Sequence, residues 1–152
     1  MTRRLLVVLA IFANAAFACE CRGLSVKEAS TAAEVIFRGT IMSFRDSPVD
    51  FGVPGMLKST KKLVVFRVTR VWKGEVGEIF EMPAARETTA CIGFWPSFLE
   101  EGADLLVYAS RATAITGNRE YYTDICKRTM LAKKSGDLKR LGAGKLPIGN
   151  SK

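Results

Sequence analysis

Residues 62–82 read KLVVFRVTRVWKGEVGEIFEM, a pattern typical of two β-strands joined by a tight turn. Over 62–72 the side chains alternate with a period of two, the spacing of a strand whose two faces meet different surroundings. Residues 73–75 (KGE) interrupt this alternation as a turn, and residues 77–82 then return as a second short strand. The stretch therefore predicts a β-hairpin.

Further strands are predicted on both sides of this hairpin. Residues 35–44 (VIFRGTIMSF) are rich in β-branched and aromatic side chains, and Gly39 stands where such a strand can bulge or bend. An apolar stretch over 104–109 and the aromatic pair Tyr121-Tyr122 supply two more strands. About five strands are thus expected in this part of the chain.

Short helices are predicted at the two ends of the domain. Ser25 is followed three residues later by Glu28, the capping-box pattern that opens a helix, here over 25–33. A second helical stretch is predicted after Cys126 and ends near Leu141. Strands that first meander and are then joined by longer connections predict a mainly β fold, a small closed or partly open barrel.

The first 18 residues match a cleavable signal peptide. A basic head at 3–4 precedes an apolar run over 5–12, and the small-x-small exit AFA stands at 16–18. Cleavage is therefore predicted after Ala18, with Cys19 as the first residue of a secreted or periplasmic protein. The apolar run falls short of the ~20 residues that span a bilayer, and no later stretch reaches that length, so no transmembrane segment is predicted.

Removal of residues 1–18 leaves 134 residues and reduces the formal net charge from +8 to +6. This length suits one domain with its own core, predicted over 19–142 and followed by a flexible tail over 143–152. Lysines and arginines are scattered, with one concentration between Lys127 and Arg140 that we interpret as the solvated face of the C-terminal helix. Because aromatic residues are not interleaved with these charges, nucleic-acid binding is not predicted.

Four cysteines lie in the exported part of the chain: Cys19, Cys21, Cys91 and Cys126. An even number in an oxidising compartment predicts a disulfide framework, for which three pairings exist. A Cys19–Cys21 bridge is disfavoured, because one intervening residue would close a small, strained ring. Each long-range bridge would close a loop on the order of 70–105 residues, contributing roughly 4–5 kcal/mol in the chain-entropy model.

Few residues are candidates for catalysis or metal binding. The chain contains no histidine, which excludes Ser-His-Asp and Cys-His nucleophilic schemes as well as a mixed Cys/His zinc site. Glu100 and Glu101 are adjacent in a turn with a following glycine, a pattern typical of a solvated loop rather than an acid–base pair. We therefore predict a protein that is not an enzyme, requires no cofactor and holds no metal of its own.

Several short motifs together resemble the netrin-like (NTR) module, and within it the N-terminal domain of the tissue inhibitors of metalloproteinases. The resemblance covers nearly all of the predicted mature chain, although each motif is short and the order of the cysteines is its most specific part. The motifs are Cys19-x-Cys21, VIFRGTI at 35–41, the turn VTRVWKG at 68–74, Cys91 followed by Gly93, LLVYA at 105–109, and Cys126.

This resemblance implies an OB-type five-stranded barrel with the disulfides Cys19–Cys91 and Cys21–Cys126. It also implies that the α-amine and carbonyl of Cys19 would chelate the catalytic zinc of a target metalloprotease. An α-amine has a reference pKa near 8 and releases its proton readily when a metal competes for it. The implied protease-contact ridge, called the contact ridge below, consists of Cys19, Glu20, Cys21, Arg22, Cys91 and Ile92.

The sequence departs from the family pattern at Glu20, where the inhibitors usually carry a small hydroxyl residue. Burial of a carboxylate in an apolar specificity pocket costs several kcal/mol unless the charge is paired. The six further cysteines of the inhibitors' C-terminal subdomain are also absent from this sequence. A non-inhibitory NTR module that binds an anionic envelope or matrix polymer is the alternative, and a lipid-linked Cys19 is a third, to which the poor lipobox AFA at 16–18 is ill suited.

Overall fold

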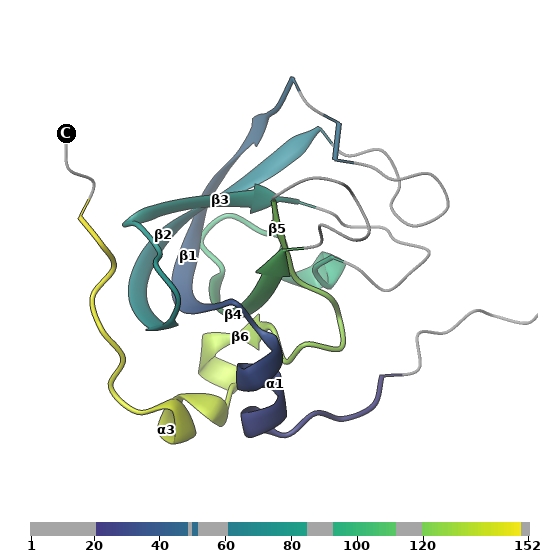
Figure 1. The fold of residues 1–152 in the computed structure, drawn as a ribbon. Helices are drawn as coiled ribbons and strands as arrows, with labels where there is room; N and C mark the ends of the chain where they lie inside the picture. Colours follow the sequence, from purple (N-terminus) through teal and green to yellow (C-terminus); the bar gives the residue numbers. More distant parts are fainter. Residues whose placement is uncertain (1–20, 49, 52–60, 85–92, 112–119, 150–152) are drawn as a thin grey trace, which may run out of the picture.

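The computed structural model describes residues 21–48, 50–51, 61–84, 93–111 and 120–149. The helices and strands follow one another in the order α1-β1-β2-β3-η1-β4-β5-β6-η2-α3, and Figure 1 shows how they are arranged. The strands are β1 (Val35–Asp46), β2 (Lys62–Lys73), β3 (Ile79–Pro83), β4 (Asp104–Arg111), β5 (Tyr121–Tyr122) and β6 (Met130–Leu131). The helices are α1 (Val26–Ala32), α3 (Asp137–Leu141) and the short 3₁₀ turns η1 (Pro96–Phe98) and η2 (Ala132–Lys134). None of the described helices is long and apolar enough to cross a membrane.

The strands form one antiparallel sheet that curls into a half barrel (Figure 1). The strand order is β3-β2-β1-β4-β5, and β6 pairs with β4 beside this path. The two ends of the order approach each other, because the rings of Phe80 on β3 and Tyr121 on β5 lie 5.5 Å apart between centroids. The predicted mainly β fold, with its long hairpin between β2 and β3, is confirmed.

Apolar side chains pack on both faces of the sheet. On the inner face they form the main core, which includes Phe37, Ile41, Val64, Phe66, Val68, Val71, Met82, Leu105 and Val107. On the outer face a second cluster joins Ile36, Leu106 and Tyr108 of the sheet to Ala29 of α1 and Leu138 of α3. The outer face is therefore covered by the two helices over only part of β1 and β4.

The pairing of β1 with β2 is interrupted by irregularities in register, one of them between Arg38 and Gly39. The sequence predicts a bulge or bend at Gly39, and the structure contains one there. A Cβ atom at Gly39 would lie 3.1 Å from the carbonyl oxygen of Arg67, so the close approach of the two strands favours glycine. This irregularity affects which side chains of β2 face outwards.

Helix α1 begins with the capping box that the sequence predicts. The backbone N–H of Glu28 donates to the Ser25 hydroxyl, and the Ser25 N–H donates to the Glu28 carboxylate at 2.8 Å. Hydrogen bonds from the backbone and side chain of Ser25 lower the pKa of Glu28 below its ordinary value. At the other end of α1, the Lys73 ammonium donates to the carbonyls of Ser30 and Thr31, which fastens the helix to β2.

The C-terminal helix is present but much shorter than predicted. A single helical stretch is expected from after Cys126 to about Leu141, whereas only α3 is α-helical there. A turn over 125–128 precedes β6, and Arg128 adopts a positive φ of 39°, a conformation outside the helical region. The tertiary pairing of β6 with β4 has overridden a local pattern that is compatible with helix.

Residues 143–149 also differ from the flexible tail that the sequence predicts over 143–152. Lys145 exchanges backbone hydrogen bonds with Val71 of β2, and Ile148 bonds to Val76 and Glu78 beside the β2–β3 turn. The indole N–H of Trp72 donates to the Gly142 carbonyl at 2.9 Å at the start of this segment. The chain after α3 is thus hydrogen-bonded to the hairpin.

Candidate functional site

Two residues of the contact ridge, Cys21 and Arg22, lie within the described part of the chain. The other four (Cys19, Glu20, Cys91 and Ile92) lie outside the described residues, as does the predicted signal peptide over 1–18. The geometry of the site is therefore built from the segments that adjoin these positions, which are residues 21–24 and Gly93.

A disulfide joins Cys21 to Cys126, with Cα atoms 5.1 Å apart and a sequence separation of 105 residues. It is one of the two pairings that the resemblance implies; the other, Cys19–Cys91, lies outside the described residues. The bond attaches the N-terminal segment 21–24 to the turn that follows β5. We call residues 123–129, which contain this turn, the anchor segment.

The same anchor segment also receives the chain that follows Cys91. The backbone N–H of Gly93 donates to the carbonyl oxygen of Thr123 at 2.8 Å. Thr123 is three residues from Cys126, so the described neighbours of both halves of the contact ridge are attached to one short stretch. This convergence of two distant parts of the sequence is what the structure adds to the site.

A buried ion pair fastens the anchor segment to the rest of the protein. The Asp137 side chain is 2% exposed, and it accepts hydrogen bonds from Arg128 Nε at 2.7 Å and from the Tyr108 hydroxyl at 2.9 Å. Arg128 also donates from Nη1 to the carbonyl oxygen of Leu24 at 2.7 Å. One arginine therefore links the N-terminal segment, the anchor segment and α3.

The ionisation of this cluster follows from its partners. Burial alone would raise the pKa of Asp137, but hydrogen bonds from Arg128 and Tyr108 and the positive charges nearby hold it below its ordinary value. The hydrogen bond to Asp137 is in turn the main cause that raises the pKa of Arg128. Burial, and then the bond to Asp137, raise the pKa of Tyr108. The three groups are thus a charged pair and a neutral phenol at neutral pH.

Two buried threonine hydroxyls extend the connection to the centre of β4. The hydroxyls of Thr123 and Thr129 lie 2.6 Å apart, and Thr123 donates to the carbonyl of Tyr108 at 2.9 Å. The backbone N–H of Tyr108 donates to the Thr129 hydroxyl at 3.0 Å. Both ends of the anchor segment are therefore hydrogen-bonded to one fully buried strand residue, which makes the segment a rigid support.

Acid is expected to remove the stabilisation that Asp137 provides. Because its folded pKa is lowered, the contribution of its carboxylate is fully present above the unfolded pKa of about 3.9 and is lost as the pH falls through the folded pKa. We expect the difference in Tm between the wild type and Asp137→Asn to shrink below about pH 4. Thermal unfolding from pH 7 to 2 measures this, and a difference that stays constant throughout would contradict it.

The N-terminal segment itself is open to solvent. The Arg22 side chain is 82% exposed and pairs with Glu28 of α1 at 3.0 Å. Trp95, two residues after Gly93, is 45% exposed, whereas the neighbouring Phe94 is buried in the core. Of these two neighbouring aromatic residues, only Phe94 contributes to the core. No local pattern distinguishes the two, because their exposure depends on packing.

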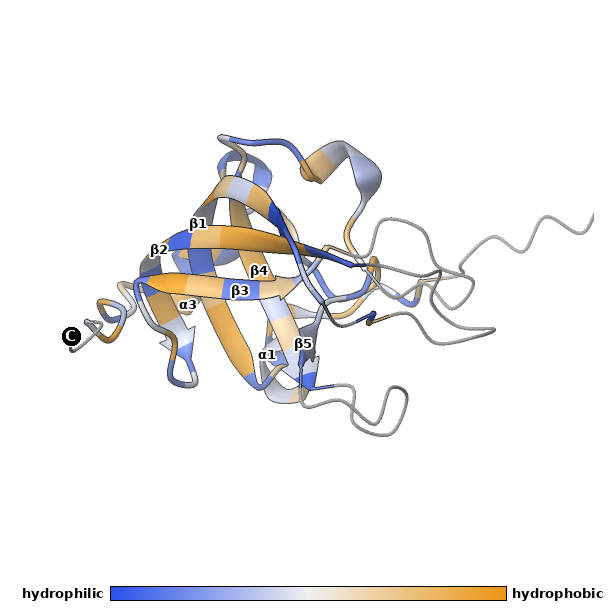
Figure 2. Cartoon of the chain, turned by 90° about the horizontal axis from the view of Figure 1, so that it is seen from above, coloured by the Kyte–Doolittle hydropathy of each residue, from blue (hydrophilic) through white to orange (hydrophobic). Residues whose placement is uncertain are grey.

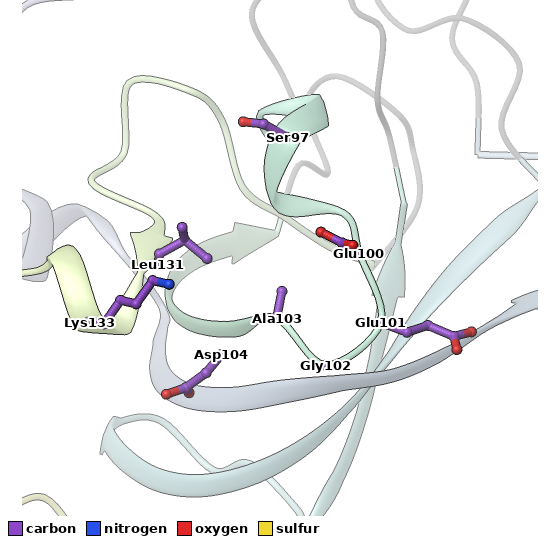
Figure 3. Close-up of a pocket in the computed structure, with 8 residues that line it drawn as sticks. All are labelled: Ser97, Glu100, Glu101, Gly102, Ala103, Asp104, Leu131 and Lys133. Atoms are coloured by element: carbon purple, nitrogen blue, oxygen red, sulfur yellow. The ribbon is translucent and has the colours of Figure 1, made fainter.

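An open pocket of about 450 Å³ lies at the start of β4, against η2. It is lined by Ser97, Glu100, Glu101, Gly102, Ala103, Asp104, Leu131 and Lys133. Figure 3 shows the carboxylates of Glu100 and Glu101 diverging from each other, and both residues are exposed. Asp104 is held by Arg38. The carboxylates of Glu100 and Glu101 are therefore not arranged as an acid–base pair that could act on one substrate.

Among the residues that the structure describes, no group of three or more Cys, Asp or Glu side chains is arranged to hold a metal ion. No family model matches the chain, and no curated protein matches it. The contacts of the anchor segment are therefore the basis on which a function can be proposed.

Proposed function

We propose that this protein is an exported, non-enzymatic partner of zinc metalloproteases that acts through the N-terminal tip of its mature chain. In this proposal the α-amine and carbonyl of Cys19 bind the catalytic zinc of the protease and displace the water that the zinc would otherwise activate. An open coordination position on a catalytic zinc is the feature that such a ligand requires.

The observation that carries the proposal is the attachment of both flanking segments to one support. Cys21 is bonded to Cys126, and Gly93 is hydrogen-bonded to Thr123. Chain connectivity keeps Cys19 within about 7 Å of Cys21 between Cα atoms. A ligand held close to a rigid support loses less conformational freedom on binding, and this favours affinity.

The strand order supports an OB-type barrel as the scaffold of the proposal. β3 and β5 are the two ends of the order, and the Phe80–Tyr121 contact lies where a five-stranded barrel would close. On such a scaffold, loops at one end of the barrel are carried by a fixed sheet, which suits presentation of a binding tip.

Glu20 directs the proposal towards a particular kind of target. In an apolar specificity pocket its carboxylate would be desolvated without a partner, at a cost of several kcal/mol. A protease whose pocket carries an arginine or lysine would instead pair with it. We therefore propose that metalloproteases with a basic pocket are the preferred targets.

The test compares a free with a blocked Cys19 amine. Protein exported with its signal peptide is first checked by mass spectrometry for an N-terminus at Cys19, and it is then assayed against catalytic domains of zinc metalloproteases with apolar and with basic pockets. One alanine added before Cys19 is expected to weaken inhibition at least about a hundredfold, equivalent to about 2.7 kcal/mol. The matched control carries the same alanine after Lys152 and should inhibit as the wild type does.

Three results would overturn the proposal. A blocked or lipid-linked Cys19 in the exported protein would remove the zinc ligand. Equal inhibition by the protein extended before Cys19 would exclude zinc chelation by the amine. The absence of inhibition across the whole panel, with a free Cys19 present, would show that the tip does not serve this function.

A further inference from the structure

A bulge in β2 places two arginines on the same face of the sheet. In a regular strand, Arg67 and Arg70 would point to opposite faces, because successive side chains alternate. The register of β1 against β2 shifts between Arg38 and Gly39, which leaves Thr69 as an extra residue on β2. As a result Arg70 lies opposite Arg38 and Arg67 lies opposite Thr40, two positions of β1 that share a face.

This face is the outer one, beyond the area that the helices cover. Both Arg67 and Arg70 are exposed, while Val68 between them is 4% exposed and points into the core. Figure 2 shows hydrophilic segments interrupting the hydrophobic strands β1 and β2. The neighbour of Arg67 on β3 is Ile79, which is 41% exposed, so the guanidinium group of Arg67 is not covered from that side by a bulky charged residue.

The other basic side chains of β1 and β2 have partners. Arg45 pairs with Glu81, Lys62 pairs with Asp46, Lys73 donates to carbonyls of α1, and Arg38 makes three hydrogen bonds to Asp104 at 2.6–3.1 Å. Within the described ranges, no carboxylate lies within salt-bridge distance of Arg67 or Arg70. The acids of the flanking strands that lie near Arg67 in the register, Glu81 on β3 and Asp104 on β4, are paired with Arg45 and Arg38.

Like charges directly opposite each other weaken a sheet. The Arg38–Arg70 pair is such a case, and Asp104 neutralises only one of its members. An external anion bound by Arg67 and Arg70 would neutralise Arg70, the member of this pair that Asp104 does not reach. Arginine is suited to this, since its planar fork forms two parallel hydrogen bonds to a sulfate or phosphate group.

We propose that the arginine face, defined as Arg67 and Arg70 with Arg38, Thr40 and Thr69, binds an acidic polysaccharide that carries sulfate or phosphate groups. This goes beyond the inhibitory function and does not use Cys19. Thr40 is the register partner of Arg67, and Thr69 precedes Arg70 and donates its hydroxyl to the carbonyl oxygen of Arg38 at 3.3 Å, so hydroxyl groups lie on the same part of the sheet as the two arginines. None of the exposed residues described on β1 and β2 is aromatic, so the stacking platform that single-stranded nucleic acids use is missing.

The experiment measures binding of the oxidised, full protein to dextran sulfate at several salt concentrations. The double variant Arg67→Ala/Arg70→Ala is expected to bind at least about thirtyfold more weakly, with a shallower dependence on salt. Lys133→Ala/Lys134→Ala is the matched control, because it removes the same charge from two exposed side chains of η2. This control should bind within about threefold of the wild type, as expected for a general loss of charge.

Two further measurements distinguish specific binding from attraction by net charge. Arg67→Lys/Arg70→Lys keeps the charge but loses the planar fork, and it should bind about fivefold or more weakly than the wild type. Dextran sulfate should also raise the Tm of the wild type more than that of Arg67→Ala/Arg70→Ala, because a ligand stabilises the state that it binds.

Equal losses in the arginine and lysine variants would overturn the proposal, since binding would then follow overall charge. Tighter binding of a thymidine 20-mer than of dextran sulfate at the same salt concentration would replace the polysaccharide with nucleic acid as the partner. Both results are independent of the protease assay, because the protein extended before Cys19 should bind dextran sulfate as the wild type does.

Discussion

Replacement of Cys21 and Cys126 by serine is expected to lower the free energy of unfolding by about 4–5 kcal/mol. The disulfide closes a loop across a sequence separation of 105 residues, so its loss gives the unfolded chain much more freedom. The expected loss is about a third or more of the typical total stability of about 5–15 kcal/mol for a domain. Urea unfolding of the double variant under non-reducing conditions measures it.

The double variant also separates stability from the position of the tip. Arg128 still bonds to the Leu24 carbonyl when the disulfide is absent, so residues near Leu24 should keep part of their protection against hydrogen exchange. Residues before Leu24 should lose theirs. A loss of stability below about 1 kcal/mol would contradict the long loop closure as the source of stabilisation.

Replacement of Asp137 by alanine is expected to cost about 3–5 kcal/mol, because it leaves the charge of Arg128 without its partner in a mostly buried site. The Tyr108 hydroxyl, which is buried, would lose its acceptor in the same variant. Chemical unfolding measures the change. Arg128 holds an uncommon positive φ of 39°, and its backbone turn should relax when the carboxylate no longer holds the guanidinium group.

Asp46→Ala is the matched control for this prediction. Asp46 also pairs with a basic residue, Lys62, but its side chain is 80% exposed. A pair in that setting contributes at most about 1 kcal/mol, because water and salt screen the charges. If both alanine variants lose the same amount of stability, the Asp137–Arg128 pair does not have the structural role assigned to it.

These two variants also test how the tip is supported. The disulfide holds the anchor segment to residue 21, and the Arg128–Leu24 bond holds it three residues further along the chain. In the proposed function both connections limit the motion of the zinc ligand. We therefore expect each variant to weaken inhibition as well as stability, with the disulfide variant more affected because its connection lies closer to Cys19.

Part of the candidate site could be predicted from the sequence for local reasons. The capping box at Ser25 depends on side chains three residues apart, and the hairpin over 62–82 depends on alternation between neighbours. Both are interactions within a short stretch, so the residues that make them are close in the sequence. No local sequence pattern predicts the Asp137–Arg128 ion pair. Its carboxylate, Asp137, also accepts a hydrogen bond from Tyr108 of β4, so the cluster forms only when that distant strand is in place.

The C-terminal region shows why a local pattern is insufficient. Residues between Cys126 and Leu141 are compatible with a helix, but Met130 and Leu131 find partners on β4 that a helix would have to give up. Backbone hydrogen bonds to a distant strand, together with burial, outweigh differences in helix propensity of less than about 1 kcal/mol per residue. The tertiary pairing of β6 with β4 therefore sets the length of α3.

The sequence by itself determined the fold class, the places of β1 to β4 and the start of α1, since these depend on periodicity and capping between near neighbours. Only the tertiary structure decided that residues 21–24 and Gly93 meet at one anchor segment, and that a one-residue bulge turns Arg67 and Arg70 to the same face. Both outcomes depend on strand register and on contacts across about 30 to 105 residues of chain, whose free energies are realised only when the whole sheet forms.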